Sequence, residues 1–248
     1  MSGIENCKAM IFAAGLGTRL KPFTDHHPKA LVKVNGKSLL ERNIDYLRSF
    51  GIREFVINTF HFSGQIHLFL AKHQQADSVF HVSYEENGPY ETGGGLAHAA
   101  KYLKEDGKPF VVMNADILTD LDLRKMFDFH MKHAPLATLA ITNRESSRQF
   151  LFDEKMKLCG WRNNKTNALK MSSASANAED LSPFSFSGVH IIDPNIFERM
   201  PTSGIYSITD TYLALAKDQL IMGYDHSGGI VLDVGKPEAL AQASTLFP

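Results

Sequence analysis

Residues 9–19 read AMIFAAGLGTR, and this stretch does most to decide the fold. Its four apolar residues at the start predict a buried β-strand that runs into a turn containing two glycines. Such a turn gathers backbone N–H groups around one concave spot, which favours the binding of an anion. Arg19 adds a planar guanidinium for phosphate, and Lys29 adds a point charge ten residues later. The combination predicts a loop that binds a triphosphate.

Two common phosphate-binding motifs do not fit this region. The dinucleotide fingerprint G-x-G-x-x-G needs a third glycine, but Leu20 stands at that position. The Walker loop matches at Gly36-Lys37-Ser38, but Leu31 stands where its first glycine belongs. For the motif alone, a glycine-rich turn without a ligand therefore stays open as the alternative.

Length, composition and charge limit the class of protein. The chain has 248 residues, 44% of them hydrophobic, which is enough for one α/β domain with a sizeable core. Because the formal net charge is −1, we expect neither nucleic acid nor a membrane as a partner. Cys7 and Cys159 form no metal or redox motif. With no membrane-length apolar run and no signal-peptide pattern, we expect a cytoplasmic monomer or small homo-oligomer.

Strands and helices alternate in the first part of the chain. Apolar runs predict buried strands at residues 55–57, 79–84, 110–113 and 136–141. Apolar residues at helical spacing predict helices around residues 40–50, 66–70, 96–103 and 123–130. Repeated βα units of this length predict an α/β fold with a doubly wound, mainly parallel sheet. Ligands of such sheets bind at the carboxyl ends of the strands.

The pattern changes after residue 144. Short strands are predicted at residues 149–153, 157–161, 184–192 and 230–232, and helices at 207–218 and 237–246. The polar stretch 163–180 is predicted to be a surface loop, with a moving lid as the alternative. Without a repeat or a long linker, we expect a single domain with a small strand-and-loop subregion.

With these motifs placed at strand ends, the chain resembles the sugar-1-phosphate nucleotidyltransferases. Members of that family join a nucleoside triphosphate to a sugar phosphate and release pyrophosphate. The matching pieces, in family order, are AAGLGTRLKPFT (13–24), PKAL (28–31), NAD (114–116), FSGV (186–189) and DVG (233–235). The resemblance implies one Rossmann-like nucleotidyltransferase domain over residues 1–248. It implies that residues 8–145 are mainly the nucleotide-binding half and residues 146–248 mainly the sugar-phosphate-binding half.

The resemblance also implies roles for particular residues. Arg19 is expected to grip the β- and γ-phosphates, and Lys29 to bridge the α-phosphate and the sugar phosphate. The residues that it implies for nucleotide binding are Ala13, Ala14, Gly15, Gly17, Thr18, Gly93, Gly94 and Gly95. It implies Asn114 and Gly188 for sugar binding. The attacking phosphate oxygen is already ionised at neutral pH, so no general base is expected.

Asp116 and Asp233 each follow an apolar strand-like run. Two carboxylates brought to one crevice by different strand ends make an oxygen site suited to Mg²⁺. In the family these positions hold the metal, and we assign both to Mg²⁺. The alternative is that each aspartate caps the helix that follows it.

Residues 91–96 read ETGGGL, and three glycines before a helix allow a nucleobase to lie against bare backbone. A flexible helix N-terminus is the alternative. The ETGGG form resembles N-acetylmuramate-1-phosphate uridylyltransferases of peptidoglycan recycling, and also some mannose- or heptose-1-phosphate guanylyltransferases. Val231, Ser207 and Lys236 depart from the family pattern near the sugar pocket, which leaves the sugar open. The chain ends at Pro248, so we expect no β-helical extension.

Three functions remain as hypotheses. The first is a Mg²⁺-dependent sugar-1-phosphate nucleotidyltransferase for cell-wall or surface polysaccharide, with UTP and N-acetylmuramate 1-phosphate ahead of GTP and mannose or heptose 1-phosphate. The second is an enzyme of the same fold with a non-sugar acceptor, such as a phosphocholine cytidylyltransferase. The third is an inactive nucleotide-sensing subunit, which the presence of all four charged residues (Arg19, Lys29, Asp116 and Asp233) disfavours.

Overall fold

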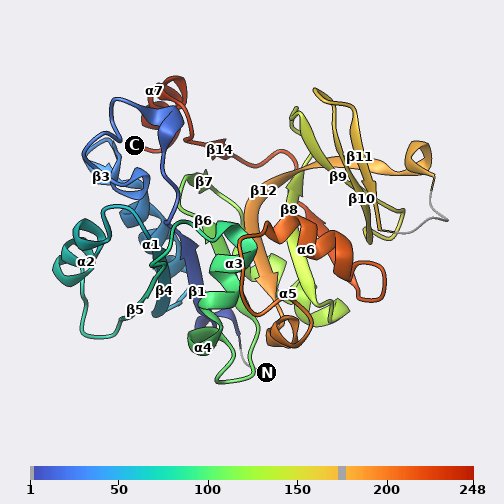
Figure 1. Ribbon diagram of the computed structural model, residues 1–248, viewed down its shortest axis with the longest axis horizontal. Helices are drawn as coiled ribbons and strands as arrows, with labels where there is room; N and C mark the ends of the chain where they lie inside the picture. The colour runs from blue at the N-terminus through green and yellow to red at the C-terminus, as the bar shows by residue number, and fades with distance from the viewer. Residues whose placement is uncertain (1–2, 173–176) are drawn as a thin grey trace.

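A mixed sheet of ten strands runs through the centre of the molecule (Figure 1). The computed structural model describes residues 3–172 and 177–248. The strands of this sheet are β1 (Lys8–Phe12), β4 (Glu54–Thr59), β5 (Val79–Tyr84), β6 (Phe110–Asn114), β8 (Ala137–Thr142), β9 (Arg148–Phe152), β10 (Leu158–Asn163), β11 (Ala168–Met171), β12 (Ser182–Ile192) and β13 (Ile221–Asp225). Two small ribbons pair β2 (Lys33–Val34) with β3 (Lys37–Ser38) and β7 (Ile117–Thr119) with β14 (Val231–Asp233).

Seven helices of the described residues surround the sheet and the ribbons. They are α1 (Leu39–Ser49), α2 (Ser63–Lys72), α3 (Glu91–His98), α4 (Ala100–Leu103), α5 (Leu123–His133), α6 (Ile208–Leu215) and α7 (Pro237–Leu246). Short 3-10 helices include Thr18–Leu20, Lys29–Leu31 and Pro194–Glu198. In the described parts of the chain, no helix combines the length and the apolar character needed to cross a membrane.

Most strands of the central sheet point the same way. Strands β5, β4, β1 and β6 pair in parallel, and β13 pairs in parallel with β8. Strand β12 runs antiparallel to both β6 and β8, so β8 and β13 share the direction of β6. The predicted α/β fold with a mainly parallel sheet is therefore confirmed, with one reversed strand in its middle. This arrangement brings the carboxyl ends of β1, β4 and β6 to one edge.

The sheet separates two apolar clusters. One contains Ile44 and Leu47 of α1 and Phe127 of α5. The other contains Leu96 of α3 and Tyr212 of α6. Because apolar residues line both faces, strands β1 and β8 are buried almost throughout, which explains their continuous apolar runs.

Strand β12 bends at Gly188 and thereby shapes the cleft. Residues 189–192 pair with β6, whereas residues 182–184 pair with β9. Gly188 has φ of +74°, and a Cβ atom there would lie 2.7 Å from Cγ1 of Ile117. Both the conformation and the lack of space require glycine. The bend turns β9, β10 and β11 away from the central strands, towards the upper right of Figure 1.

Three predictions of secondary structure are corrected. The predicted surface loop at residues 163–180 contains β11, which forms an antiparallel pair with β10. The residues of β11 are mostly exposed, so the sequence shows no alternation of apolar and polar residues there. Strand β13 was missed, and β14 joins β7 in a separate ribbon rather than the main sheet. Residues 173–176 of the proposed lid lie outside the described residues.

Helix α7 returns to the first part of the chain (top of Figure 1). Nδ2 of Asn35 donates a hydrogen bond to the carbonyl of Ser244, 2.8 Å away. Ala243 of α7 belongs to a third apolar cluster with Leu20 and Val34. The division into halves at residues 145 and 146 stays a prediction, but α7 packs with the first of them.

Candidate active site

Hydrogen bonds to other parts of the chain hold the turn after β1, and most of its own N–H groups stay free. Gly17 has φ of +65°, and Oγ1 of Thr24 donates to its carbonyl at 2.8 Å. The N–H of Ala13 donates to Oδ1 of Asn58 at 2.7 Å. Among the described residues, the N–H groups of residues 14–18 have no protein acceptor. The turn therefore presents the free N–H groups that an anion needs.

A cavity of about 230 Å³ lies beside this turn. Residues of four segments line it: 12–15, 29–30, 114–116, and the pair Glu91 and Thr92 at the start of α3. Asn58, Glu85 and Pro89 complete its wall. Of the residues predicted to bind nucleotide, Ala13, Ala14 and Gly15 line the cavity, while Gly17 and Thr18 shape the turn next to it.

The glycines at 93–95 lie behind the cavity wall rather than on its surface. The N–H groups of Gly93 and Gly94 donate to the carbonyl of Tyr206 at 2.9 and 3.2 Å. A Cβ atom on Gly95 would lie 2.8 Å from Oε1 of Glu85. Protein atoms therefore take up the space on the Cβ side of all three glycines. Their role in nucleotide binding stays a prediction, and close packing explains the glycines.

A buried carboxylate links the two walls of the cavity. Glu85 is fully buried, and its Oε1 accepts a hydrogen bond of 2.7 Å from Nδ2 of Asn58. Its Oε2 accepts another of 2.7 Å from the N–H of Tyr90. Burial raises the pKa of Glu85, while these two donors act against the rise. Since Asn58 also holds Ala13, one chain of hydrogen bonds connects the first turn with the start of α3.

Lys29 and Asp116 form an ion pair at the end of β6. Both side chains are largely shielded, with exposed fractions of 15% and 20%. Nδ2 of Asn43, buried in α1, donates to the carbonyl of Ala115 at 3.0 Å. This bond fixes the turn that carries Asp116, so the carboxylate points to a defined place.

Asp233 reaches the same gap from the ribbon of β14 and β7. The N–H of Val234 donates to the carbonyl of Asp116 at 2.8 Å, which ties the two acidic segments together. Desolvation, and next the negative charge of Asp116, raise the pKa of Asp233, while Lys29, Arg19 and Arg144 lower it. The outer side of Asp233 remains open to solvent. The two carboxylates therefore influence one another across one gap.

Neither aspartate caps a helix. The N-cap of α5 is Asp122, whose carboxylate accepts from the N–H groups of Arg124 and Lys125 at 3.1 and 3.2 Å. The N-cap of α7 is Lys236. The capping alternative is thus excluded for both Asp116 and Asp233.

Arg19 extends to the far side of this gap. A Cβ atom on Gly235 would lie 2.6 Å from Oδ1 of Asp233 and 3.1 Å from Nη2 of Arg19. The two side chains therefore flank the same small space. Two cations and two carboxylates, from three distant parts of the chain, surround one gap beside the cavity.

The residues predicted to bind sugar lie on the other side of Asp116. A Cβ atom on Gly188 would lie 3.0 Å from Nδ2 of Asn114. Buried Ser187 precedes Gly188, and its Oγ lies 2.9 Å from Nε2 of His226. The structure therefore brings Asn114 and Gly188 together at the bend of β12.

The nucleotidyl transferase family is identified by its sequence model, which matches residues 8–150. This chain belongs to that family. Its sequence is 30% identical over 242 residues to N-acetylmuramate alpha-1-phosphate uridylyltransferase of Neisseria meningitidis serogroup B. The aligned region covers 96% of this chain and 97% of the relative. It is 25% identical over 255 residues to a mannose-1-phosphate guanyltransferase of Aspergillus oryzae, which covers 97% of this chain. The chain spans 64% of that relative's length.

Solved structures of low sequence identity share the fold of this nucleotidyl transferase family member. HddC from Yersinia pseudotuberculosis, complexed with GMP-PN, matches with a TM-score of 0.74 and 22% identity, covering 98% of this chain and 100% of that one. A UDP-glucose pyrophosphorylase complexed with UDP-glucose matches with a TM-score of 0.77 and 21% identity, covering 97% and 98%. The family predicted from the motifs is confirmed.

The donor set of this family member fits a magnesium ion. Mg²⁺ is commonly held by one or two carboxylates together with water and substrate phosphates. Asp116 and Asp233 supply two carboxylates whose mutual repulsion a divalent cation relieves. Within the described residues, no group of three or more His, Cys, Asp or Glu side chains could hold a metal by itself.

Sequence reasoning missed Asn43 and Asn58, and it gave Glu85 no role at the nucleotide site. Asn58 and Glu85 stand at the end of apolar strands, where a polar residue signals the ligand edge. That signal indicates that a residue lies at the ligand edge of the sheet, but not which groups its side chain contacts. In the structure, Glu91 at the start of α3 has a φ of +58°, which is uncommon for a residue other than glycine.

Proposed function

We propose that this protein transfers a nucleoside monophosphate from a nucleoside triphosphate to a sugar 1-phosphate and releases pyrophosphate. The arrangement of Lys29, Asp116 and Asp233 around one gap beside the cavity carries the proposal. The best candidate pair is UTP and N-acetylmuramate 1-phosphate, in the cytoplasm, for cell-wall or surface polysaccharide.

The chain's contribution to the reaction is positioning and neutralisation of charge. The sugar phosphate is an ionised nucleophile, so the barrier comes from repulsion between two anions and from charge on the departing pyrophosphate. Free N–H groups of the first turn and the Arg19 guanidinium hold the triphosphate tail. Lys29, which pairs with Asp116 in the free protein, turns to the phosphates that meet at the gap.

Asp116 and Asp233 are the residues that would hold Mg²⁺ in this account. The metal, when bound, supplies positive charge that stabilises the phosphoryl group in transfer. Asn43 and the ribbon of β14 and β7 keep the two carboxylates in place.

The relative from Neisseria meningitidis favours the uridylyl assignment, because it is matched over nearly its full length. The fungal relative supports a second candidate, guanylyl transfer to mannose 1-phosphate. The choice of nucleotide base and of acceptor sugar is therefore the most specific part of the proposal.

A screen for pyrophosphate release tests the proposal. Four nucleoside triphosphates are combined with a panel of sugar 1-phosphates in the presence of Mg²⁺. We expect UTP with N-acetylmuramate 1-phosphate to give the fastest release, and Asp116→Asn to lower kcat by about 10²–10³-fold. Fastest release with GTP would favour the second candidate. No release from any pair would contradict the enzymatic proposal and support a sensing subunit.

A further inference from the structure

Arg144 is a cationic residue near Asp233 that the family motifs do not explain. It follows β8 at the same edge of the sheet as Asp116. Oγ of Ser185 donates to the Arg144 carbonyl at 2.7 Å, and Nη2 of Arg144 donates to the carbonyl of Phe186 at 3.0 Å. These bonds hold the guanidinium against β12, two residues before the bend at Gly188.

The positive charge of Arg144 lacks a close counter-charge. In the described parts of the chain, no carboxylate lies within 4.0 Å of its nitrogen atoms. Its Nε is buried and has no hydrogen-bond partner there. A half-buried cation with an unused donor is costly, because part of its hydration is lost without replacement.

The neighbouring histidine does not supply the missing charge. His226 lies near Arg144. Burial lowers the pKa of His226, the charges of Asp120 and Asp225 act against this, and the Arg144 charge lowers it further. The imidazole is therefore neutral at pH 7, with Nε2 beside Oγ of Ser187. Its buried Nδ1 has no partner among the described residues. Nε of Arg144 and Nδ1 of His226 are therefore two buried nitrogen atoms without a hydrogen-bond partner in this region.

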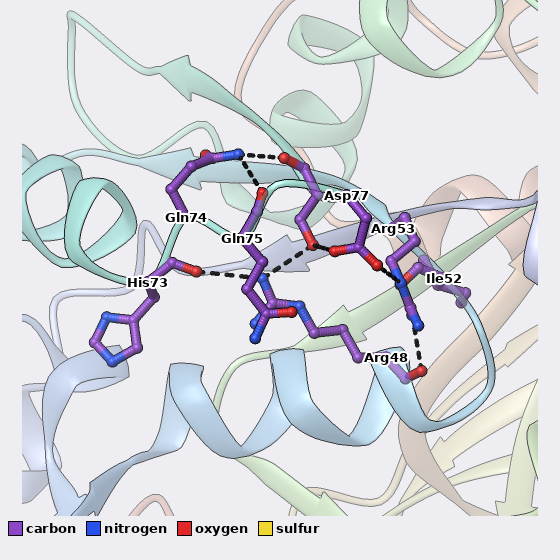
Figure 2. Close-up of polar contacts among 8 residues, drawn as sticks. Arg48, Ile52, Arg53, His73, Gln74, Gln75 and Asp77 are labelled. Atoms are coloured by element: carbon purple, nitrogen blue, oxygen red, sulfur yellow. Dashed lines mark hydrogen bonds and ion pairs between the residues drawn. The ribbon is translucent and has the colours of Figure 1, made fainter.

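Arg48 shows what a structural arginine looks like in this protein (Figure 2). Its Nη2 donates to the carbonyl of His73 and to Oγ of Ser78, at 3.3 and 3.1 Å. Its guanidinium also lies over the rings of Phe55 and Phe80. Those contacts tie α1 to the loop before β5, although Nε of Arg48, like that of Arg144, is buried without a hydrogen-bond partner. The difference is that the side chain of Arg144 makes a single hydrogen bond, to the carbonyl of Phe186.

We propose that Arg144 binds anionic oxygen atoms of the acceptor sugar 1-phosphate. The inference rests on the proposed function, since it concerns the acceptor of that reaction. The planar guanidinium matches a phosphate or a carboxylate with two parallel N–H groups. Arg19 serves the nucleotide side of the gap and Lys29 bridges the two phosphates, so Arg144 is the cation on the Gly188 side. The oxygens come either from the sugar's phosphate or from a carboxylate on the sugar, such as the lactyl group of N-acetylmuramate.

Calorimetric titration of the full chain in Mg²⁺ separates these sources. The two probes are N-acetylmuramate 1-phosphate and N-acetylglucosamine 1-phosphate, which differ in the lactyl carboxylate. Arg144→Gln should weaken binding by about 10- to 100-fold, and Arg144→Lys by less, because lysine keeps the charge but loses the fork. Arg199→Gln is the matched control, since Arg199 is exposed and follows the 3-10 helix Pro194–Glu198 at the opposite edge of the sheet.

Loss of affinity for both probes in Arg144→Gln would assign the contact to the phosphate. Loss for N-acetylmuramate 1-phosphate alone would assign it to the carboxylate. Unchanged affinity for both probes, in a variant that melts like the wild type, would overturn the inference and leave the proposed function standing. If the wild type binds neither probe, the assignment of N-acetylmuramate 1-phosphate as acceptor fails and the inference fails with it. In kinetics, KM for the sugar phosphate should rise while KM for the nucleotide stays the same.

Discussion

The ion pair of Lys29 and Asp116 joins the first loop to the end of β6. Lys29→Ala removes the charge that meets the phosphates, so kcat should fall by about 10²–10³-fold and KM for the sugar phosphate should rise. Steady-state kinetics with both substrates varied measures this. A change confined to the melting temperature would contradict the assigned role.

Glu85 is buried with both carboxylate oxygens accepting hydrogen bonds. In Glu85→Gln, an amide N–H faces another donor, which costs about 1–3 kcal/mol of stability and loosens the cavity wall. We expect KM for the nucleoside triphosphate to rise about tenfold, with a smaller change for the sugar phosphate. The exposed neighbour provides the control variant Glu86→Gln. Equal kinetics in the two variants would show that Glu85 does not position the nucleotide site.

At the scale of the elements, β12 matters most because its bend separates the central strands from the β9–β11 region. Gly188→Ala forces a Cβ atom against Ile117 in β7 and strains the positive φ. We expect a loss of stability of about 1–3 kcal/mol and a raised KM for the sugar phosphate. Thermal unfolding and kinetics check both effects. A variant with the wild-type melting temperature and KM would contradict the role of this bend.

The contiguous parts of the site could be predicted from the sequence, and the dispersed parts could not. Residues 13–19 and 114–116 combine an apolar strand with the turn or carboxylate that follows it, so local physics identifies them. Glu85 and Arg144 are single polar residues after a strand. Their importance depends on which groups fold against them, and no local pattern contains that. Strand β11 was missed for a related reason, since a mostly exposed strand has no apolar alternation.

At the scale of the whole molecule, two buried histidines link stability to pH. Burial lowers the pKa of His130 to about 4 and that of His190 to about 3. Both are neutral in the fold, whereas the unfolded chain binds protons below its ordinary value of about 6.5. Stability is therefore complete above pH 6.5 and is lost as the pH falls towards 4, by about 3 kcal/mol for His130.

Urea unfolding at pH 7.5 and pH 5 measures this dependence. His130→Gln should show a smaller loss of unfolding free energy between the two pH values than the wild type. His133→Gln is the control, because His133 is exposed on the same helix. The same pH dependence in all three proteins would contradict the account.

In the proposed reaction, Asp116 and Asp233 share one divalent metal with the nucleotide. Electron paramagnetic resonance titration with Mn²⁺ and a non-hydrolysable UTP analogue tests it most directly. We predict one protein-bound Mn²⁺ in the wild type and in the cap variant Asp122→Ala, with affinity at least about tenfold weaker in both Asp116→Asn and Asp233→Asn. Wild-type Mn²⁺ affinity in either of these two variants would contradict the shared site.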